Sequence, residues 1–279
     1  MKSEEISSAS NPKFKKLLVL QEKSSLRRSE GLFVVEGRRE ISNMLKAGFI
    51  PETIFLCRDI FPDCEALLEK ASEANPDLLV VEIPRALYAK AAFREGTEGI
   101  VAEVRSRKMK LTDIPLRENP LIVVLEAVEK PGNLGAVLRS ADAAKADAVI
   151  VCDPLTDLYN PNLIRASLGA IFTVPCVACA SDDAIGWLKA HKIQILTAQL
   201  QDSKLYYDTP MTGGTAIVMG TESTGLSPVW RQSADAHIRI PMLGTLDSLN
   251  VSVSAAILLF EAVRQRRMGS AATQYPLRV

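Results

Sequence analysis

The segment that most constrains the fold is LIVVLEAV, residues 121–128, which is a nearly continuous apolar run. A strand with one wet face alternates apolar and polar residues, whereas a strand covered by helices on both faces is apolar throughout. The run therefore predicts a buried strand of a parallel sheet. Further strands are expected at 148–152, 174–178, 193–198, 215–220 and 237–242, and helices at 133–145, 161–171, 182–191 and 250–267. Strands that alternate with helices predict an α/β fold.

The N-terminal part predicts a second, smaller α/β unit. Its strands are expected at 32–37, 53–57, 78–83 and 99–106, and its helices at 38–47, 64–74 and 85–92. Residues 107–119 are polar, lack periodicity and contain a proline, which is typical of a linker. A chain of 279 residues is also long enough for two domains. We therefore expect domains at 1–106 and 120–279, joined by the linker 107–119.

Charge and hydropathy narrow the class of protein. The chain has 33 basic and 33 acidic residues, which argues against a strongly basic nucleic-acid binder. Residues 1–46 nevertheless carry 10 basic against 6 acidic residues. That excess fits either a solvated helix surface or a face that contacts phosphates.

No run approaches the ~20 apolar residues of a membrane span, and the N-terminal segment lacks a signal-peptide core, so we expect a cytoplasmic protein.

The cysteines and histidines do not indicate a metal site. Cys176 and Cys179 form a C-x-x-C pair inside an apolar run, and no second pair stands at zinc spacing. The chain has only two histidines, His191 and His237. We therefore expect reduced, buried, structural thiols and no bound metal.

Common nucleotide-binding motifs are absent from the loops that follow the predicted strands. The loop after 121–128 reads EKPGNLG and lacks G-x-G-x-x-G. Residues 220–227 read GTESTGLS, with Leu226 in place of the P-loop lysine. There is no G-x-S-x-G nucleophile elbow either. Dinucleotide enzymes, P-loop NTPases and α/β-hydrolases are thus not supported.

The first of three polar loops is PGNLGAVLRSADA, residues 131–143. Asn133 is a candidate helix N-cap. Arg139 lies off the apolar stripe of the predicted helix, and Gly135, one turn earlier, leaves space for its side chain to reach the strand end. The alternative is an ordinary surface arginine paired with Asp142.

Two more loops carry polar residues at strand ends. Residues 218–227 read VMGTESTGLS, which fits either an ordinary polar loop or one that offers backbone groups to a ligand. Residues 240–256 include Gly244, which permits close backbone approach, and Ser248 and Asn250, for which helix capping is the simpler explanation.

Together, the three loops resemble the three motifs of the SpoU/TrmH family of RNA ribose 2′-O-methyltransferases, within the SPOUT superfamily. The matching residues are Asn133, Gly135 and Arg139 in motif 1, Gly220, Glu222, Gly225 and Leu226 in motif 2, and Ile240, Pro241, Met242, Gly244, Ser248, Leu249, Asn250, Val251 and Ser252 in motif 3. The resemblance covers residues 120–267. The N-terminal part is similar to the family's small substrate-binding domain, which is related to a ribosomal-protein fold that grips RNA. Thr221, Ser223 and Thr224 depart mildly from motif 2.

The resemblance implies a deep trefoil knot in the C-terminal domain, S-adenosylmethionine as cofactor, a homodimer and an RNA substrate, with ribosomal RNA preferred to transfer RNA. It implies catalytic roles for Arg139, Asn133, Glu222, Ser248 and Asn250. The implied cofactor-binding residues are Met219, Gly220, Thr221, Gly225, Ile240, Met242, Gly244, Ser248 and Leu249. The basic excess then predicts RNA contacts by Lys13, Lys15, Lys16, Arg27, Arg28 and Arg38, with Arg139.

Other functions remain open at this point. A non-catalytic RNA- or ribosome-binding factor could use the same fold, and a base could be methylated instead of the ribose. The zero net charge would also suit an unrelated enzyme acting on a small metabolite. Within the expected reaction, Arg139 could act as a base or as an electrostatic stabiliser, and the second role is favoured because guanidinium rarely loses a proton.

Overall fold

A computed structural model of the chain describes residues 1–93, 98–221 and 224–268. The chain forms two compact units. The first combines Met1–Lys108 with Asp157–Thr173, and the second combines Met109–Thr156 with Val174 onward. The predicted linker is not a free segment, because from Met109 it belongs to the second unit. Ile114 is buried in that unit's core, and the Arg117 guanidinium pairs with Asp147 at 2.7 Å.

Within the described residues, the second unit is built on a seven-stranded, all-parallel sheet, which confirms the predicted α/β fold. The strand order is β10-β12-β9-β11-β6-β7-β8. The strands are β6 (Leu121–Glu126), β7 (Ala148–Cys152), β8 (Cys176–Cys179), β9 (Gln194–Ala198), β10 (Lys204–Leu205), β11 (Thr215–Met219) and β12 (Ala236–Arg239). The apolar run thus forms β6, which is buried between β11 and β7.

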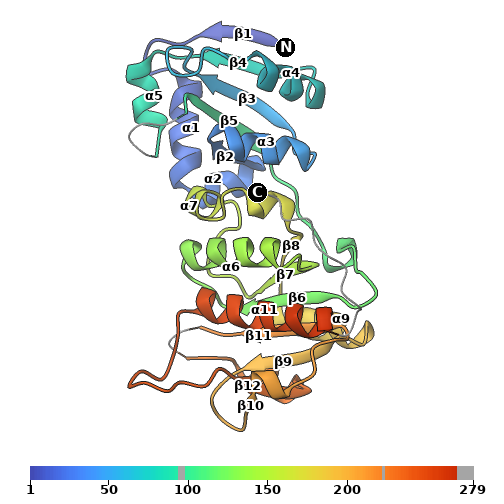
Figure 1. Cartoon of the computed structure of the whole chain (residues 1–279). Helices are drawn as coiled ribbons and strands as arrows, with labels where there is room; N and C mark the ends of the chain where they lie inside the picture. Colours follow the sequence, from blue (N-terminus) through green and yellow to red (C-terminus); the bar gives the residue numbers. More distant parts are fainter. Residues whose placement is uncertain (94–97, 222–223, 269–279) are drawn as a thin grey trace. The chain divides into compact units, whose positions relative to one another are not determined.

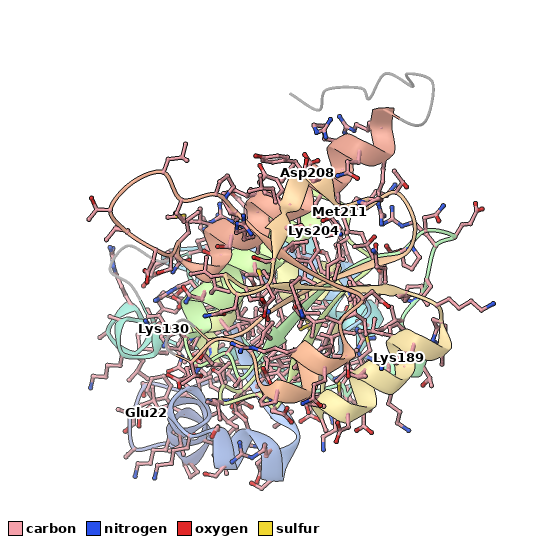
Figure 2. The ribbon with its side chains drawn as sticks, turned by 90° about the horizontal axis from the view of Figure 1, so that it is seen from below. Glu22, Lys130, Lys189, Lys204, Asp208 and Met211 are labelled. Atoms are coloured by element: carbon pink, nitrogen blue, oxygen red, sulfur yellow. The ribbon has the colours of Figure 1, made fainter. Side chains whose placement is uncertain are left out.

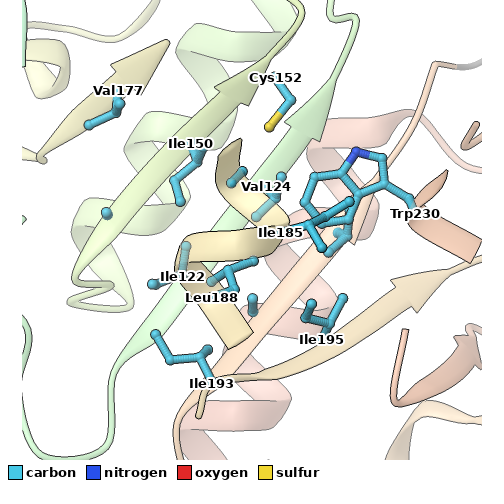
Figure 3. Packing of buried hydrophobic residues seen from close by; sticks show 14 of the residues in the cluster. Ile122, Val124, Ile150, Cys152, Val177, Ile185, Leu188, Ile193, Ile195 and Trp230 are labelled. Atoms are coloured by element: carbon cyan, nitrogen blue, oxygen red, sulfur yellow. The ribbon is translucent and has the colours of Figure 1, made fainter. Parts of the chain in front are cut away.

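Helices cover both faces of this sheet (Figure 1). The helices α6 (Pro131–Ala143) and α11 (Val251–Met268) pack together over β6 and β11. The helices α9 (Ser181–Ala190) and α10 (Pro228–Ser233) pack on the other face. There, Trp230 belongs to a buried cluster with apolar side chains of β6, β7, β9 and α9, and it lies next to Ile185 of α9 (Figure 3). Burial on both faces explains why β6 carries so few polar residues.

Arg266 fastens the C-terminal half of α11. Its guanidinium donates hydrogen bonds to the carbonyl oxygens of Met211 (2.9 Å), Asn119 (2.7 Å) and Gly213 (2.7 Å). Met211 lies beside this half of the helix (Figure 2). The segment between β9 and β11 includes β10 and a short 3₁₀ turn at Tyr206–Asp208, and a similar turn occurs at Leu111–Asp113.

The first unit has a mixed five-stranded sheet of order β1-β4-β3-β5-β2. Its strands are β1 (Lys2–Glu5), β2 (Leu32–Glu36), β3 (Pro51–Leu56), β4 (Leu79–Glu82) and β5 (Ile100–Arg105), and β5 runs antiparallel to β2 and β3. Its helices are α1 (Pro12–Glu22), α2 (Ser24–Glu30), α3 (Arg38–Lys46), α4 (Glu65–Ala74) and α5 (Arg85–Ala91). The apolar residues Phe14, Leu17 and Leu20 of α1 fill its core.

The segment Asp157–Thr173 packs in the first unit, although the sequence placed it in the C-terminal domain. The helix predicted at 161–171 is divided into α7 (Pro161–Ala166) and α8 (Ala170–Thr173) by Leu168 and Gly169, which both have positive φ. Tyr159 stacks on Phe33 of β2, with ring centroids 4.2 Å apart. The apolar side chains of the segment therefore cover β2 instead of the parallel sheet.

Candidate functional site

The three polar loops meet at the carboxyl edge of the parallel sheet. Strands β6 and β11 are neighbours in register, with Leu125 opposite Met219, so the loops that follow them emerge side by side. A cavity of about 360 Å³ opens there. Among the described residues it is lined by Met219, Gly220, Thr221, Gly225, Ile240, Met242, Ser248 and Leu249 of the predicted cofactor set. Gly244 is not among the lining residues.

The lining also includes a loop that the sequence analysis missed. Residues 198–201, which follow β9, contribute Gln199, Leu200 and Gln201 to the wall. The position of this loop could have indicated its role, because ligands of open α/β sheets bind beyond the carboxyl ends of the strands and this loop follows the strand β9. Two arginines, Arg231 and Arg239, lie in the wall as well.

The loop after β11 is folded tightly on itself. The Thr221 N–H donates to the Gly225 carbonyl at 3.2 Å, and the Gly225 N–H donates back to the Thr221 carbonyl at 3.1 Å. A Cβ at position 220 would lie 2.1 Å from the Gly225 carbonyl oxygen, so only glycine fits there. Gly225 itself has φ +68°, a conformation that favours glycine. Glu222, a predicted catalytic residue in this loop, lies outside the described residues.

Asn133 and Asn250 join the first and third motifs. The Asn250 side-chain N–H donates to Asn133 Oδ1 at 3.1 Å. Asn250 Oδ1 accepts from the Ser252 N–H at 2.9 Å. Asn250 therefore also caps α11, which is the helix-capping role expected from the sequence. Asn133 is not the N-cap of α6, and that prediction is wrong. The helix begins at Pro131, since proline suits the first helical position, and Lys130 is the cap residue.

Arg139 lies on α6 with an exposed side chain. It makes no hydrogen bond or ion pair with any residue in the described part of the chain, so the alternative pairing with Asp142 does not form there. It is six residues beyond Asn133, which corresponds to about 9 Å along the helix axis. Helical side chains lean toward the N-terminus, so the long Arg139 side chain can extend toward the strand ends.

A second cavity, of about 150 Å³, adjoins the first. Gly220, Thr221 and Val251 line both cavities. The smaller one is otherwise lined by the end of β6 and the start of α6, namely Leu125, Glu126, Ala127, Val128, Glu129, Lys130 and Asn133. Asn133 therefore faces a small polar space next to the larger cavity.

The larger cavity fits the cofactor that the resemblance implies. Its apolar side chains, including Leu226, Ile240 and Leu249, suit the flat adenine ring. The closely approaching backbone at Gly220 and Gly225 offers peptide groups to a polar ligand. Asp247 supplies a carboxylate and accepts from the Ser248 hydroxyl at 3.2 Å. These groups can bind an adenosine that carries a charged amino-acid tail.

The cysteines are free thiols. Cys152 and Cys179 stand opposite each other on β7 and β8, and a hydrogen bond from the Cys152 thiol lowers the pKa of Cys179. Burial raises the pKa of Cys176 to about 12. Among the residues that the structure describes, no group of three or more histidine, cysteine or acidic side chains is arranged to hold a metal ion.

The predicted RNA-binding residues of the first unit include three that already have partners, two that are exposed and one, Arg27, that is buried. Lys13 pairs with Glu4 at 2.6 Å and Lys16 with Glu30 at 3.1 Å, while Arg38 donates to the carbonyls of Glu98 and Ile60, both at 3.1 Å. Lys15 and Arg28 are exposed.

Arg27 is a correction to that prediction. Its side chain is only 4% exposed, and its guanidinium donates to Asp157 at 2.7 Å and to the Leu20 carbonyl at 2.6 Å. It is therefore a structural residue of the first unit and is not available to a phosphate.

Comparisons with known proteins match two parts of the chain to known families. The sequence model of the "SpoU rRNA Methylase family" matches residues 120–260, and that of the "MRM3-like substrate binding domain" matches residues 11–102. The chain is 31% identical over 273 residues to the 23S rRNA (uridine(2479)-2′-O)-methyltransferase of Streptomyces viridochromogenes, covering 94% of this chain and 93% of that one. It is 28% identical to the 23S rRNA (guanosine(2553)-2′-O)-methyltransferase RlmP of Bacillus subtilis, covering 92% and 98%.

A solved structure is similar over nearly the whole chain. The AdoMet-bound rRNA methyltransferase from Sinorhizobium meliloti superimposes with a TM-score of 0.87 at 29% identity, covering 94% of this chain and 98% of that one. No helix in the described part of the chain is both long and apolar enough to cross a membrane.

Proposed function

Because the chain belongs to the SpoU rRNA methylase family, we propose that it transfers a methyl group from S-adenosylmethionine to a ribose 2′-hydroxyl of ribosomal RNA. The observation that carries this proposal is the convergence of the three motifs on two adjoining cavities, where the Asn133–Asn250 hydrogen bond joins the first motif to the third. The rRNA 2′-O-methyltransferases to which the chain is similar support the choice of substrate.

The cavity residues would hold the cofactor. Leu226, Ile240 and Leu249 would contact the adenine, and the peptide groups around Gly220 and Gly225 would bind polar atoms of the adenosine. When bound, S-adenosylmethionine supplies an electrophilic methyl group on a positively charged sulfur, which becomes neutral when the methyl leaves. The protein's task is then to align the ribose oxygen and raise its negative charge.

Arg139 is the residue that we assign to that charge. Its exposed guanidinium would bind an RNA phosphate and stabilise the developing alkoxide. We assign it the role of stabiliser in preference to that of base, because a guanidinium rarely loses a proton. Asn133 and Asn250 would position the ribose at the smaller cavity, and Ser248 and Glu222 complete the proposed set.

The first unit would bind the RNA around the target nucleotide. Its match to a substrate-binding domain and its exposed cations Lys15 and Arg28 support this role. Lys13, Lys16 and Arg38 remain candidates, although each already has a partner within the unit. The domain boundary near residue 106 stays a proposal, amended by the segment 157–173.

We further propose that the protein is a cytoplasmic homodimer with the family's knotted topology. Apolar side chains beside the larger cavity support the dimer. Leu243 is 96% exposed and Leu246 75% in the loop before α11, and Val253 and Phe260 are exposed on α11 itself. A patch of this kind is typical of a surface that a second copy covers.

The test is methyl transfer from labelled S-adenosylmethionine to total rRNA and tRNA, with wild type and Arg139→Ala in parallel. We expect label in rRNA, on the ribose after digestion to nucleosides, and its loss in the variant. Label only in tRNA would reassign the substrate. Absence of both label and cofactor binding would overturn the proposal, and unchanged cellular function of Arg139→Ala would favour a non-catalytic RNA-binding factor.

A further inference from the structure

Glu126 is a buried carboxylate at the meeting point of the three loops. It is the last residue of β6, and its side chain is only 8% exposed. It lines the smaller cavity together with Asn133, Thr221 and Val251, which belong to or adjoin the first, second and third motifs. An ionisable group buried at such a place costs free energy, so its contacts require an explanation.

In the described part of the chain, the Glu126 side chain accepts a hydrogen bond from the far end of the loop that follows β11. Glu126 Oε2 accepts from the backbone N–H of Ser227 at 2.8 Å, across 101 positions of sequence. Its other oxygen accepts no hydrogen bond from any residue in the described part of the chain. A hydrogen bond that a backbone N–H donates to a carboxylate is charge-assisted, and such a bond is stronger than one between neutral groups.

The bond completes the fastening of residues 220–227. Pairing of β11 with β6 fixes the beginning of the loop, and two backbone hydrogen bonds join Thr221 to Gly225. Its end, Ser227, precedes α10 but makes no side-chain cap, and its buried hydroxyl has no hydrogen-bond partner among the described residues. The backbone N–H of Ser227 is thus the group that ties this end to the sheet, and Glu126 is the acceptor that it uses.

We propose that Glu126 is a positioning residue, which holds the loop 220–227 in the conformation that binds the cofactor. The inference rests on the proposed function, because the loop walls the proposed cofactor cavity. In this assignment Glu126 acts through the loop and not on the reacting atoms. Its effect therefore falls on cofactor affinity, whereas a carboxylate that deprotonated the ribose hydroxyl would affect turnover.

The experiment measures the Kd of S-adenosylhomocysteine by calorimetry, together with KM and kcat for methyl transfer. Glu126→Ala removes the acceptor. Ser227→Pro removes the donor, and the Ser227 φ of −64° already suits proline. We expect each to raise the Kd about tenfold or more, as for loss of a hydrogen bond to a charged group, with kcat largely retained. Glu126→Gln keeps an acceptor oxygen and should bind within a few-fold of wild type.

The chain provides a matched control in Asp147. This carboxylate is 6% exposed and accepts from the Leu121 N–H at 2.7 Å, at the opposite end of the same strand. Asp147→Ala should lower stability without changing the Kd of the folded protein. The double variant Glu126→Ala/Ser227→Pro should bind no more weakly than either single variant, because both remove the same bond.

Several outcomes would overturn the inference. These are an unchanged Kd in Glu126→Ala and Ser227→Pro, an equal loss of affinity in Asp147→Ala, or a Glu126→Gln enzyme with normal Kd and lost turnover. The last result would make Glu126 a catalytic base. If Glu126→Ala does not fold, Ser227→Pro and Glu126→Gln decide the question. Wild-type protein that binds no S-adenosylhomocysteine would refute the proposed function itself, which separates the two failures.

Discussion

The buried carboxyl of Glu103 should make the stability of the first unit depend on pH. Glu103 lies on β5 and is only 5% exposed, and burial raises its pKa to about 7. The Lys16 ammonium and the Thr53 hydroxyl favour the charged form but do not offset the burial. One carboxylate oxygen has no hydrogen-bond partner among the described residues. The perturbation that we choose is Glu103→Gln, which keeps the shape and removes the titration.

The direction in which the free energy of unfolding changes with pH follows from proton binding. Between pH 4.5, the ordinary value, and about 7, the folded protein keeps a proton that the unfolded chain has released. Stability therefore falls as the pH rises through this window, by about 1.4 kcal/mol per pH unit and about 3 kcal/mol in all. The penalty is complete above pH 7 and absent below pH 4.5. Glu103→Gln should thus match wild type at pH 4.5 and exceed it by about 2–3 kcal/mol at pH 8.

The assay is urea unfolding followed by labelling of Cys57, a fully buried thiol that follows β3 in the same unit. Comparing wild type and variant at each pH cancels the pH dependence of the labelling reaction. Glu69→Gln, which changes an exposed glutamate on α4, is the control and should show no such trend. Two results would contradict a raised pKa for Glu103. One is a difference in free energy of unfolding between Glu103→Gln and wild type that does not change with pH, and the other is a variant less stable than wild type at pH 8.

Three other changes test the structure. Asp157→Ala leaves the Arg27 guanidinium buried without its carboxylate, so unfolding of the first unit should become easier by about 3–5 kcal/mol, whereas an exposed ion pair would show under about 1 kcal/mol. Gly220→Ala places a methyl group against the Gly225 carbonyl, so calorimetry should detect no S-adenosylhomocysteine binding by a protein that still folds; normal binding would contradict the tight loop. Arg139→Ala should lower turnover about 100-fold or more with cofactor affinity retained, and a loss of cofactor affinity instead would place Arg139 in the cofactor site.

The parallel sheet and its loops were predictable because local signals suffice for them. An apolar run such as that of β6 identifies a doubly covered strand wherever it occurs, and the loops after such strands form one edge. The start of α6 could also have been predicted, since a proline favours the first helical position, and Pro131 indicates the helix start more strongly than Asn133 indicates a cap. The loop after β9 follows from the same edge rule, although it carries no recognisable motif.

What the sequence could not reveal depends on partners distant along the chain. Arg27 looks like any other cation of a polar N-terminal segment, and its partner Asp157 lies 130 positions away along the chain. The helix expected at 161–171 has ordinary periodicity, but the positive φ of Leu168 and Gly169 divides it so that both halves pack in the first unit. Glu126 was overlooked because its partner Ser227 lies 101 positions away.

The division of the chain also bears on how such proteins can be recombined. The backbone passes between the two units at Lys108–Met109, at Thr156–Asp157 and again at Thr173–Val174. A single crossover near residue 108 would exchange residues 1–108 between two relatives. It would not exchange the segment Asp157–Thr173, which also belongs to the first unit. The hybrid would then match one parent's Tyr159 and Asp157 against the other parent's Phe33 and Arg27. The two units are thus inherited as one piece unless three junctions change together.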